Sequence, residues 1–331
     1  MNIKVYGAGT WGTALAEMLV QNGHEVDLWH YKADFIHSIQ KSLIHPNLPS
    51  HRLSKKIHFT EDVNVESDID IIVIAVPCQE IRGLLNKIIF SRFNPIIVSV
   101  SKGLEHDTGK TMSQVILENK YIDFNSICVL YGPSHAEEVM KKIPTTIVAS
   151  SYNEKISKRI QDTFSNQFFR VYRNSDVLGV EFGGSVKNVI SIAAGICRGI
   201  GYGDNTIAAL LVRGSKELSR FGIALGAKRE TFFGLSGIGD LIVTSTSKHS
   251  RNRQVGEWIG IGLSLKQISQ QMSMVAEGIE TTKAIMMVAN NKNIEMPICS
   301  EVYKILFENK SALLAMNDLM TRELTSEYSN N

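Results

Sequence analysis

Three glycines near the start of the chain have the spacing of a phosphate-binding turn. Gly7, Gly9 and Gly12 form the pattern G-x-G-x-x-G, which follows the apolar run 3–6 and opens a helical pattern over 13–22. In such a turn the first glycine permits the tight bend, the second lets a pyrophosphate approach the backbone, and the third lets the helix pack closely. The N–H groups and dipole at the helix start then face the phosphates. The spacing predicts a dinucleotide site, although three glycines can also form an ordinary tight turn.

The residues after the second apolar run bear on which dinucleotide would bind. A site for NAD(H) usually places Asp or Glu here, where the carboxylate accepts hydrogen bonds from the ribose hydroxyls. This chain instead has His30, Tyr31 and Lys32, none of which would repel a 2′-phosphate, and Asp27 lies earlier in the run. We therefore favour NADP(H) slightly over NAD(H) and exclude neither. The alternative that Lys32 is only a solvated surface charge stays open.

Polar residues also follow two later apolar runs, as Ser-Lys-Gly at 101–103 and Gly-Pro-Ser at 132–134. Open α/β sheets bind ligands beyond the carboxyl ends of their strands. If both runs are strands of one sheet, Lys102 and the Ser134 hydroxyl converge on the same crevice. The other interpretation is that these glycines and the proline are ordinary turn formers.

The first half of the chain contains elements that could position these groups. Short β-branched runs alternate with helical patterns, which is typical of a parallel sheet covered by helices on both faces. The predicted strands are 3–6, 25–29, 69–76, 96–100, 127–130 and 145–149. Several are apolar at consecutive positions, as expected of strands buried on both faces. The sequence therefore predicts a doubly wound α/β sheet of the Rossmann type.

The second half has long helical patterns and little that resembles a strand. The clearest helical patterns are 176–198, 206–221 and 280–290. Asp176 is suited to cap the first of them, because its carboxylate can accept from unpaired backbone N–H groups. We place the boundary near residue 178, which gives a dinucleotide-binding domain at 1–178 and a helical substrate and catalytic domain at 179–331.

Composition excludes several classes of protein. The chain has 331 residues, of which 44% are hydrophobic, and its formal charge of +2 is too small to predict a nucleic-acid partner. The start lacks the pattern of a secretory signal, and no apolar stretch approaches the roughly 20 residues of a membrane span. The cysteines, which have neither metal-ligand nor redox spacing, are Cys78, Cys128, Cys197 and Cys299. We expect a cytoplasmic protein with reduced thiols and no metal.

Eight ordered motifs carry a resemblance to a known family. They are Gly-Ala-Gly-Thr-Trp-Gly-Thr-Ala-Leu-Ala at 7–16, Ser-Lys-Gly-Leu-Glu at 101–105, Gly-Pro-Ser-His-Ala at 132–136, Val-Lys-Asn-Val at 186–189, Gly-Tyr-Gly-Asp-Asn-Thr at 201–206, Gly-Ile-Gly-Asp-Leu at 237–241, Ser-Arg-Asn-Arg at 250–253 and Glu-Gly at 277–278. Together they resemble the bacterial NAD(P)-dependent glycerol-3-phosphate dehydrogenase family. The resemblance runs from residue 3 to about 297, and a set of ordered motifs is far more specific than one glycine turn.

The resemblance implies a fold and a reaction. The fold is a Rossmann domain followed by an all-α domain similar to that of 6-phosphogluconate dehydrogenase. The reaction is the reversible NAD(P)H-dependent reduction of dihydroxyacetone phosphate to sn-glycerol 3-phosphate, which supplies the phospholipid backbone. Lys187 would be the catalytic lysine, giving a proton to the substrate C2 oxygen and taking it back in the reverse direction, and Asp240 would orient or assist it. Such a pair suits the chemistry, because hydride arrival at a carbonyl builds negative charge on its oxygen.

Without the resemblance, a lysine in an amphipathic helix would usually be a surface charge. The neighbouring Gly183 and Gly184 point instead to close backbone approach at this part of the helix.

The resemblance also implies binding residues. At the substrate phosphate, Arg251 offers a planar donor fork, Asn252 an amide and Ser250 a hydroxyl. The implied substrate-binding residues are Lys102, Gly132, Ser134, Lys187, Asp240, Ser250, Arg251 and Asn252. With the residues argued above, the cofactor-binding set is Gly7, Gly9, Thr10, Trp11, Gly12, His30, Tyr31, Lys102, Ala136, Arg251, Val275 and Glu277. A homodimer is the default expectation for such an enzyme.

Some positions depart from the family pattern. His135 stands where Phe is common, Ser245 stands where Cys often occurs, and the segment 45–49 lacks a usual Tyr. These changes remove no proposed catalytic group, but they bear on the loop expected to cover the cofactor at 42–53 and on packing beside the phosphate.

Two alternatives remain from the sequence. One is another enzyme with the same two-domain plan, such as a ketopantoate reductase or a 3-hydroxyacyl-CoA dehydrogenase, since fold does not determine substrate. The latter would present a His and Glu pair in place of Lys187 and Asp240. The other is a regulatory protein that senses a dinucleotide without performing chemistry.

Overall fold

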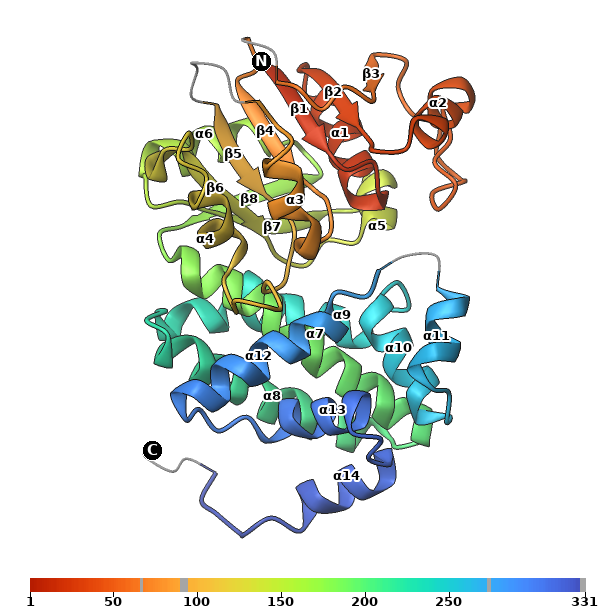
Figure 1. Ribbon diagram of the computed structural model, residues 1–331, viewed down its shortest axis with the longest axis vertical. Coiled ribbons are helices and arrows are strands. Elements are labelled where there is room, and N and C mark those ends of the chain that lie inside the picture. The colour runs from red at the N-terminus through yellow and green to blue at the C-terminus, as the bar shows by residue number, and fades with distance from the viewer. Residues whose placement is uncertain (66–67, 90–94, 273–274, 328–331) are drawn as a thin grey trace.

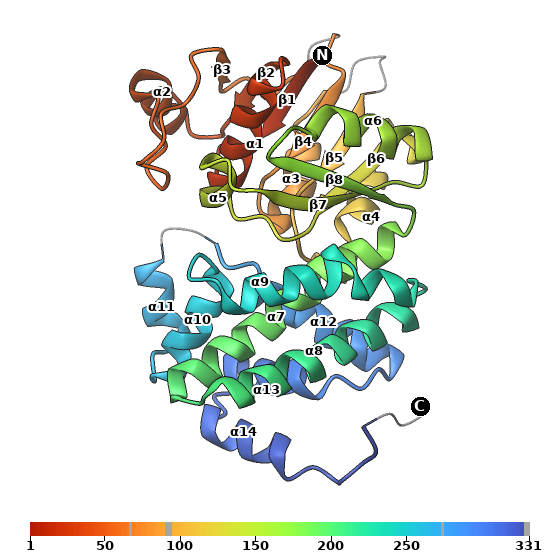
Figure 2. The ribbon, with the colours of Figure 1, turned by 180° about the vertical axis from the view of Figure 1, so that it is seen from behind.

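The chain forms a sheet-containing half and an all-helical half, stacked end to end (Figures 1 and 2). The computed structural model describes residues 1–65, 68–89, 95–272 and 275–327. The predicted plan of a Rossmann-type sheet followed by an all-α part is confirmed.

The sheet has eight strands and a reversal of strand order beside β1. In spatial order the strands are β3 (Ile57–Thr60), β2 (Glu25–Trp29), β1 (Asn2–Tyr6), β4 (Ile71–Ile74), β5 (Ile96–Ser99), β6 (Ile127–Tyr131), β7 (Thr145–Ser150) and β8 (Phe169–Asn174). β1 pairs in parallel with both β2 and β4, so the crevice at the carboxyl ends of these strands is the expected ligand site.

Each of the six predicted strands overlaps an observed one, but two further features were not predicted. The sheet also has β3 and β8 at its two edges, where strands are only partly buried and lack a continuous apolar run. β6 and β7 are antiparallel, so the expectation of a wholly parallel sheet is wrong at that pair. The connection there holds only the five-residue helix α5 (Ala136–Met140), which is too short for an ordinary parallel crossover.

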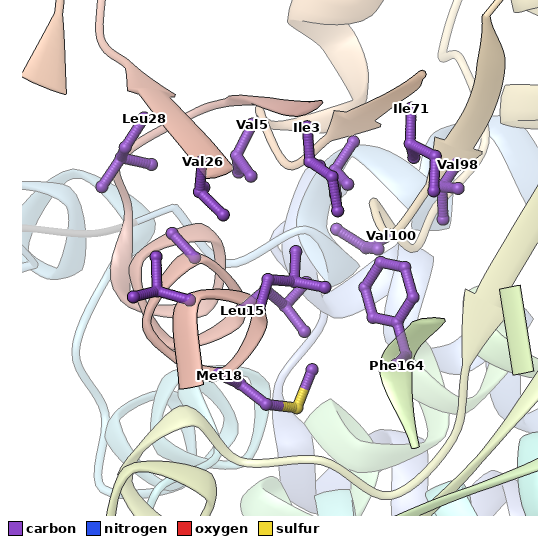
Figure 3. Close-up of a cluster of buried hydrophobic side chains, with 14 of the residues drawn as sticks. Ile3, Val5, Leu15, Met18, Val26, Leu28, Ile71, Val98, Val100 and Phe164 are labelled. Carbon is purple, nitrogen blue, oxygen red and sulfur yellow. The ribbon is translucent and has the colours of Figure 1, made fainter. Parts of the chain in front are cut away.

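Helices cover the sheet, and their apolar side chains pack against those of the strands to form the main core. They are α1 (Thr10–Gln21), α2 (Ala33–Ser42), α3 (Ile81–Leu85), α4 (Met112–Leu117), α5 and α6 (Glu154–Phe164). Figure 3 shows Leu15 and Met18 of α1 in one apolar cluster with Val5 of β1, Val26 of β2 and Phe164 of α6. This apolar contact fixes α1 against the sheet and so fixes the glycine turn at its start.

The helical half is built around α7. Its helices are α7 (Val177–Ile200), α8 (Asp204–Ala224), α9 (Asp240–Thr246), α10 (Arg251–Gly260), α11 (Leu265–Gln271), α12 (Gly278–Lys292), α13 (Pro297–Phe307) and α14 (Ala312–Met320), with short turns η3 (Arg229–Phe233) and η4 (Leu235–Gly239). Among the described helices only α7 is long and apolar enough to cross a membrane, but 94% of its most apolar window is buried in the protein. The expectation that no apolar stretch approaches that length is therefore wrong for α7, which is a core helix, and no membrane span is indicated.

Asp176 fixes the junction between the two halves. Only Ser175 and Asp176 separate β8 from α7. One carboxylate oxygen of Asp176 accepts from the Gly179 N–H at 3.0 Å, which confirms the predicted cap. The other oxygen accepts from the Lys228 N–H at 2.8 Å and from the Thr231 hydroxyl at 2.7 Å. The junction is thus tied to the loop after α8 as well as to α7.

Glycines let α7 and α10 pack with their backbones in contact. A β-carbon at Gly256 would lie 2.0 Å from the Ile192 carbonyl oxygen, and one at Gly195 would lie 2.0 Å from the Arg253 carbonyl oxygen. Real side-chain carbons do not approach this closely, so both positions require glycine. The contact sets the position of the whole of α10, including its first residue, Arg251.

Replacing Gly256 with alanine should therefore destabilise the protein by about 3 kcal/mol, because overpacking at a close contact is costly. The loss is measured by chemical denaturation. Gly83→Ala is the matched control, since a β-carbon there meets no heavy atom within 4 Å and α3 should gain up to about 1 kcal/mol from the better helix former. Equal stability of the two variants would contradict the close-packing argument.

Candidate active site

The glycine turn has the geometry of a dinucleotide cradle. Gly7 has a φ of +117°, and a β-carbon on it would lie 2.6 Å from the Ala75 carbonyl oxygen. A β-carbon on Gly12 would lie 1.9 Å from the Gly7 carbonyl oxygen, so α1 packs directly onto the turn. Gly9 instead faces open space, with no heavy atom within 4 Å of an added β-carbon, and caps α1 without any side-chain hydrogen bond. The turn therefore fits a pyrophosphate at the start of α1.

The other predicted cofactor residues near the turn lie in two kinds of surroundings. His30 is half-buried between Tyr31 and Phe35, with ring centroids 4.7 and 4.5 Å away, and Tyr31 is exposed. Thr10 is buried in α1, and Trp11 packs against the core beside Phe169. His30 and Tyr31 are thus more accessible to a ligand than the buried Thr10, and Trp11 is partly buried.

The loop expected to cover the cofactor is attached to the glycine turn by a residue to which we had given no role. The buried His45 donates from Nε2 to the Ala8 carbonyl oxygen at 3.1 Å, and its Nδ1 accepts from the Asn47 N–H at 3.1 Å. These two bonds hold the segment after α2 over the turn. No sequence pattern indicates such a contact, because 37 residues separate the two partners.

A carboxylate shared by two ammonium groups forms the centre of the site. Asp240 accepts from Lys187 Nζ at 2.9 Å through one oxygen and from Lys102 Nζ at 2.7 Å through the other. Lys102 also donates to the Gly132 carbonyl oxygen at 2.7 Å, and Lys187 donates to the Thr244 hydroxyl at 2.7 Å. Lys102 and Gly132 come from the sheet, whereas the other three residues come from the helical half, so the centre spans both.

The electrostatics of this centre favour proton exchange near neutral pH. Burial lowers the pKa of Lys187 to about 8; Asp240 opposes this shift, while Lys102 and Arg251 add to it. Burial alone would raise the pKa of Asp240, but the two ammonium groups outweigh it and hold that pKa below its usual value. The site therefore contains an ionised carboxylate beside an amine that can lose its proton in the working range of enzymes.

Two local features bring Asp240 to Lys187. A β-carbon on Gly183, one turn before Lys187 on α7, would lie 2.5 Å from the Ser236 carbonyl oxygen of η4. η4 is a single π-helical turn, a rare form often found at functional sites, and α9 begins with Asp240 directly after it. The close approach predicted from Gly183 and Gly184 is confirmed, since a β-carbon on Gly184 would meet the Tyr131 ring at 2.7 Å.

Asn188 and Asn252 connect the centre to the predicted phosphate cluster. Asn188 donates to the Lys102 carbonyl oxygen at 3.3 Å and accepts from the Asn252 amide at 2.9 Å. The side-chain oxygen of Asn252, Oδ1, in turn accepts from the Gly278 N–H at 3.0 Å. Neither Asn188 nor Thr244 was among the predicted site residues. For Thr244 a signal existed, because it lies four residues after Asp240 and thus on the same face of α9.

The predicted phosphate-binding residues lie together at the start of α10, and each of them already forms a hydrogen bond within the protein. Ser250 caps the helix by accepting from the Arg253 N–H at 3.2 Å. Asn252 is buried in the amide network, and Arg251 donates from Nη1 to the Val275 carbonyl oxygen at 2.7 Å. Ser134 donates to the Gly132 carbonyl oxygen at 3.0 Å. The guanidinium of Arg251 has further donors, so phosphate binding here remains a prediction.

Glu277 links the helical half to the end of β4. Its carboxylate accepts from the Cys78 N–H at 3.1 Å and from the Cys78 thiol at 2.7 Å. Burial raises the pKa of Glu277. Of the other predicted cofactor residues, Ala136 is buried at the start of α5, and Val275 is half exposed. All four cysteines are buried and form no disulfide with one another.

The described residues contain no group of three His, Cys, Asp or Glu side chains that could hold a metal ion. The fold and site instead define a two-domain, dinucleotide-dependent dehydrogenase with a lysine and carboxylate centre.

Comparison with known proteins agrees with this class. Residues 2–157 match the family model for the N-terminus of NAD-dependent glycerol-3-phosphate dehydrogenase, and residues 176–317 match the one for its C-terminus. Glycerol-3-phosphate dehydrogenase [NAD(P)+] of Chlorobium phaeobacteroides is 48% identical over 99% of both chains. The enzyme of the same name from Fusobacterium nucleatum is 45% identical over 98% of this chain and 97% of its own. The chain therefore belongs to the NAD-dependent glycerol-3-phosphate dehydrogenase family, as the ordered motifs predicted.

A solved structure supports the same assignment. The crystal structure of glycerol-3-phosphate dehydrogenase from Coxiella burnetii has a TM-score of 0.90 and 33% identity, covering 97% of this chain and 99% of its own. The similarity thus extends over both halves and their arrangement.

Replacing Asp240 with asparagine should destabilise the protein by about 3–5 kcal/mol at neutral pH, because it leaves buried positive charge uncompensated. The loss should shrink as pH rises toward about 10.4, where a lysine in the unfolded chain also gives up its proton. Denaturant titrations at several pH values measure it. The double variant Asp240→Asn with Lys187→Met is the control and should recover most of the loss; no recovery would contradict the charge argument.

Proposed function

We propose that this protein catalyses the reversible NAD(P)H-dependent reduction of dihydroxyacetone phosphate to sn-glycerol 3-phosphate. The observation that carries the proposal is the buried Lys187, held by Asp240 at the crevice where the carboxyl ends of the strands meet the helical half. The names of the close relatives support the same substrate pair. A protein that only senses a dinucleotide has no use for a buried proton donor with a lowered pKa.

Lys187 acts as the proton donor in this proposal. The nicotinamide, when bound, supplies the hydride for reduction or accepts it in oxidation. The Lys187 ammonium stabilises the negative charge that develops on the C2 oxygen and transfers its proton there. Asp240 and Thr244 hold the amine in place through bonds of 2.9 and 2.7 Å. Lys102 adds a second positive charge beside the same oxygen.

The substrate phosphate is assigned to Arg251, with the other polar groups at the start of α10 and the sheet residues Lys102 and Ser134 around it. A guanidinium offers five donors, of which the bond to Val275 uses one. The position also fits an anion, because α10 begins at Arg251 and the positive end of the helix dipole lies there.

The remaining parts of the proposal rest on the family and on the end of β2. His30, Tyr31 and Lys32 offer no carboxylate to a ribose, so NADP(H) is slightly favoured over NAD(H). The cytoplasm is the assigned compartment, and the product would supply the phospholipid backbone, as is usual for this family. A homodimer is the default oligomeric state.

Oxidation of NADPH, followed at its absorbance band, should depend on dihydroxyacetone phosphate, with a lower kcat/KM for NADH. Lys187→Met should lower kcat by about 10²–10⁴-fold, because it removes the general acid. Lys155→Met, on the exposed face of α6, is the control and should keep the wild-type rate. Wild-type protein that binds NADPH without turnover would contradict an enzyme and favour a dinucleotide sensor.

The two directions of the reaction should respond oppositely to pH. Because the pKa of Lys187 is about 8, kcat/KM for reduction should fall above that pH as the amine loses the proton that it must donate. Oxidation needs the neutral amine and should accelerate over the same range. Steady-state profiles between about pH 6 and 10 test both limbs. Identical profiles in wild type and Lys187→Met would assign the proton to another group.

A further inference from the structure

His135 carries a ring nitrogen that has no hydrogen-bond partner. It follows Ser134 at the end of β6 and is the N-cap residue of α5, to which its side chain gives no capping bond. Its ring is half-buried, and its Nε2 atom is fully buried without any hydrogen-bond partner. Few side-chain polar atoms among the described residues share this condition. A buried imidazole nitrogen without a partner carries an uncompensated desolvation cost, so a ligand that supplies the partner binds more tightly.

The surroundings of the ring belong to the proposed active site. Burial, followed by the charges of Lys187 and Lys102, lowers the pKa of His135 to about 4, while Asp240 acts in the opposite direction and His249 adds a small lowering. The imidazole is therefore neutral in the working pH range, with one nitrogen as donor and the other as acceptor. A neutral ring can bond a substrate oxygen without competing for the proton on Lys187.

The ring also lies close to the residue that precedes the predicted phosphate cluster. The centroids of the His135 and His249 rings are 5.7 Å apart, at an interplanar angle of 52°. His249 directly precedes Ser250, the residue that caps α10, and Arg251, its first residue. His135 is thus close both to the groups assigned to the reacting carbonyl and to His249, which adjoins the residues assigned to the phosphate.

We propose that His135 is a substrate-binding residue whose Nε2 hydrogen-bonds an oxygen of the bound triose phosphate. The inference rests on the proposed function and assigns a residue to that same site. Phenylalanine would fill similar space without the nitrogen, so the polar contact is specific to the imidazole. The bond fixes the triose between Lys187 and Arg251.

Steady-state kinetics of His135→Phe and His135→Gln test the inference. His135→Phe should raise KM for dihydroxyacetone phosphate about tenfold, equivalent to about 1.4 kcal/mol, and leave KM for NADPH within about twofold. His135→Gln should recover much of the loss, because its amide can donate from a similar distance. His24→Phe is the control, since this half-buried histidine directly precedes β2, at the amino ends of the strands and so away from the site.

Competition by inorganic phosphate locates the oxygen. If its inhibition constant rises in His135→Phe as it should in Arg251→Ala, the oxygen belongs to the phosphate; if it is unchanged while KM rises, the oxygen belongs to the carbonyl or hydroxyl end. An unchanged KM in His135→Phe overturns the inference. So does an equal rise in the glutamine variant, or a parallel rise in KM for NADPH, since each indicates packing alone. Absence of wild-type turnover would instead refute the proposed function, which keeps the two failures distinct.

Discussion

One buried carboxylate accepts a hydrogen bond from an ammonium group of each half of the molecule, and the geometry of the rest of the site depends on this pair of contacts. Asp240 accepts from Lys102 of the sheet and from Lys187 of α7 at less than 3 Å. Without Asp240, Lys187 would be a buried charge with a large desolvation cost, and Lys102 a partly buried one. Together they are partly compensated, and the remaining positive charge is directed at the crevice. In the proposed reaction, a carbonyl oxygen that gains negative charge there would meet a proton donor that is already oriented and removed from water.

Close backbone contacts position the residues that form the Asp240–Lys187 hydrogen bond. Gly183 lets η4 touch α7 one turn from Lys187, and Gly256 and Gly195 let α10 lie against the same helix. Asn188 and Asn252 then connect the loop after β5 with α7, α10 and the start of α12. The glycines let the backbones of η4 and α10 approach α7 closely, and the amide hydrogen bonds fix how these helices are aligned along one another. The geometry of the centre therefore follows from packing that is distributed along the length of α7.

The sequence predicted those parts of the site that local rules control. The glycine turn, Lys102 and Gly132 follow strands, and the carboxyl ends of neighbouring parallel strands meet at one edge, so their convergence could be argued from periodicity. Lys187 and Asp240 are 53 residues apart on different helices, and only the resemblance paired them. Asn188, His45 and the edge strand β8 depend on tertiary contacts that no periodicity encodes. The antiparallel pairing of β7 with β6 was not predicted, because we extended the parallel pattern of the neighbouring strands to β7, whereas the connection between β6 and β7 holds only a short helix.

The junction at Asp176 has a mechanical consequence. Two residues join the sheet to α7, and the carboxylate of one is anchored by three donors in the helical half. The covalent link thus has almost no slack and cannot serve as a loose tether. A rotation of one half against the other would therefore move α7 as a rigid body, and the amine of Lys187 would move with it. The hydrogen bonds between Glu277 and Cys78 join the two halves a second time, 199 residues apart along the chain, so rotation about the Asp176 junction would have to break them.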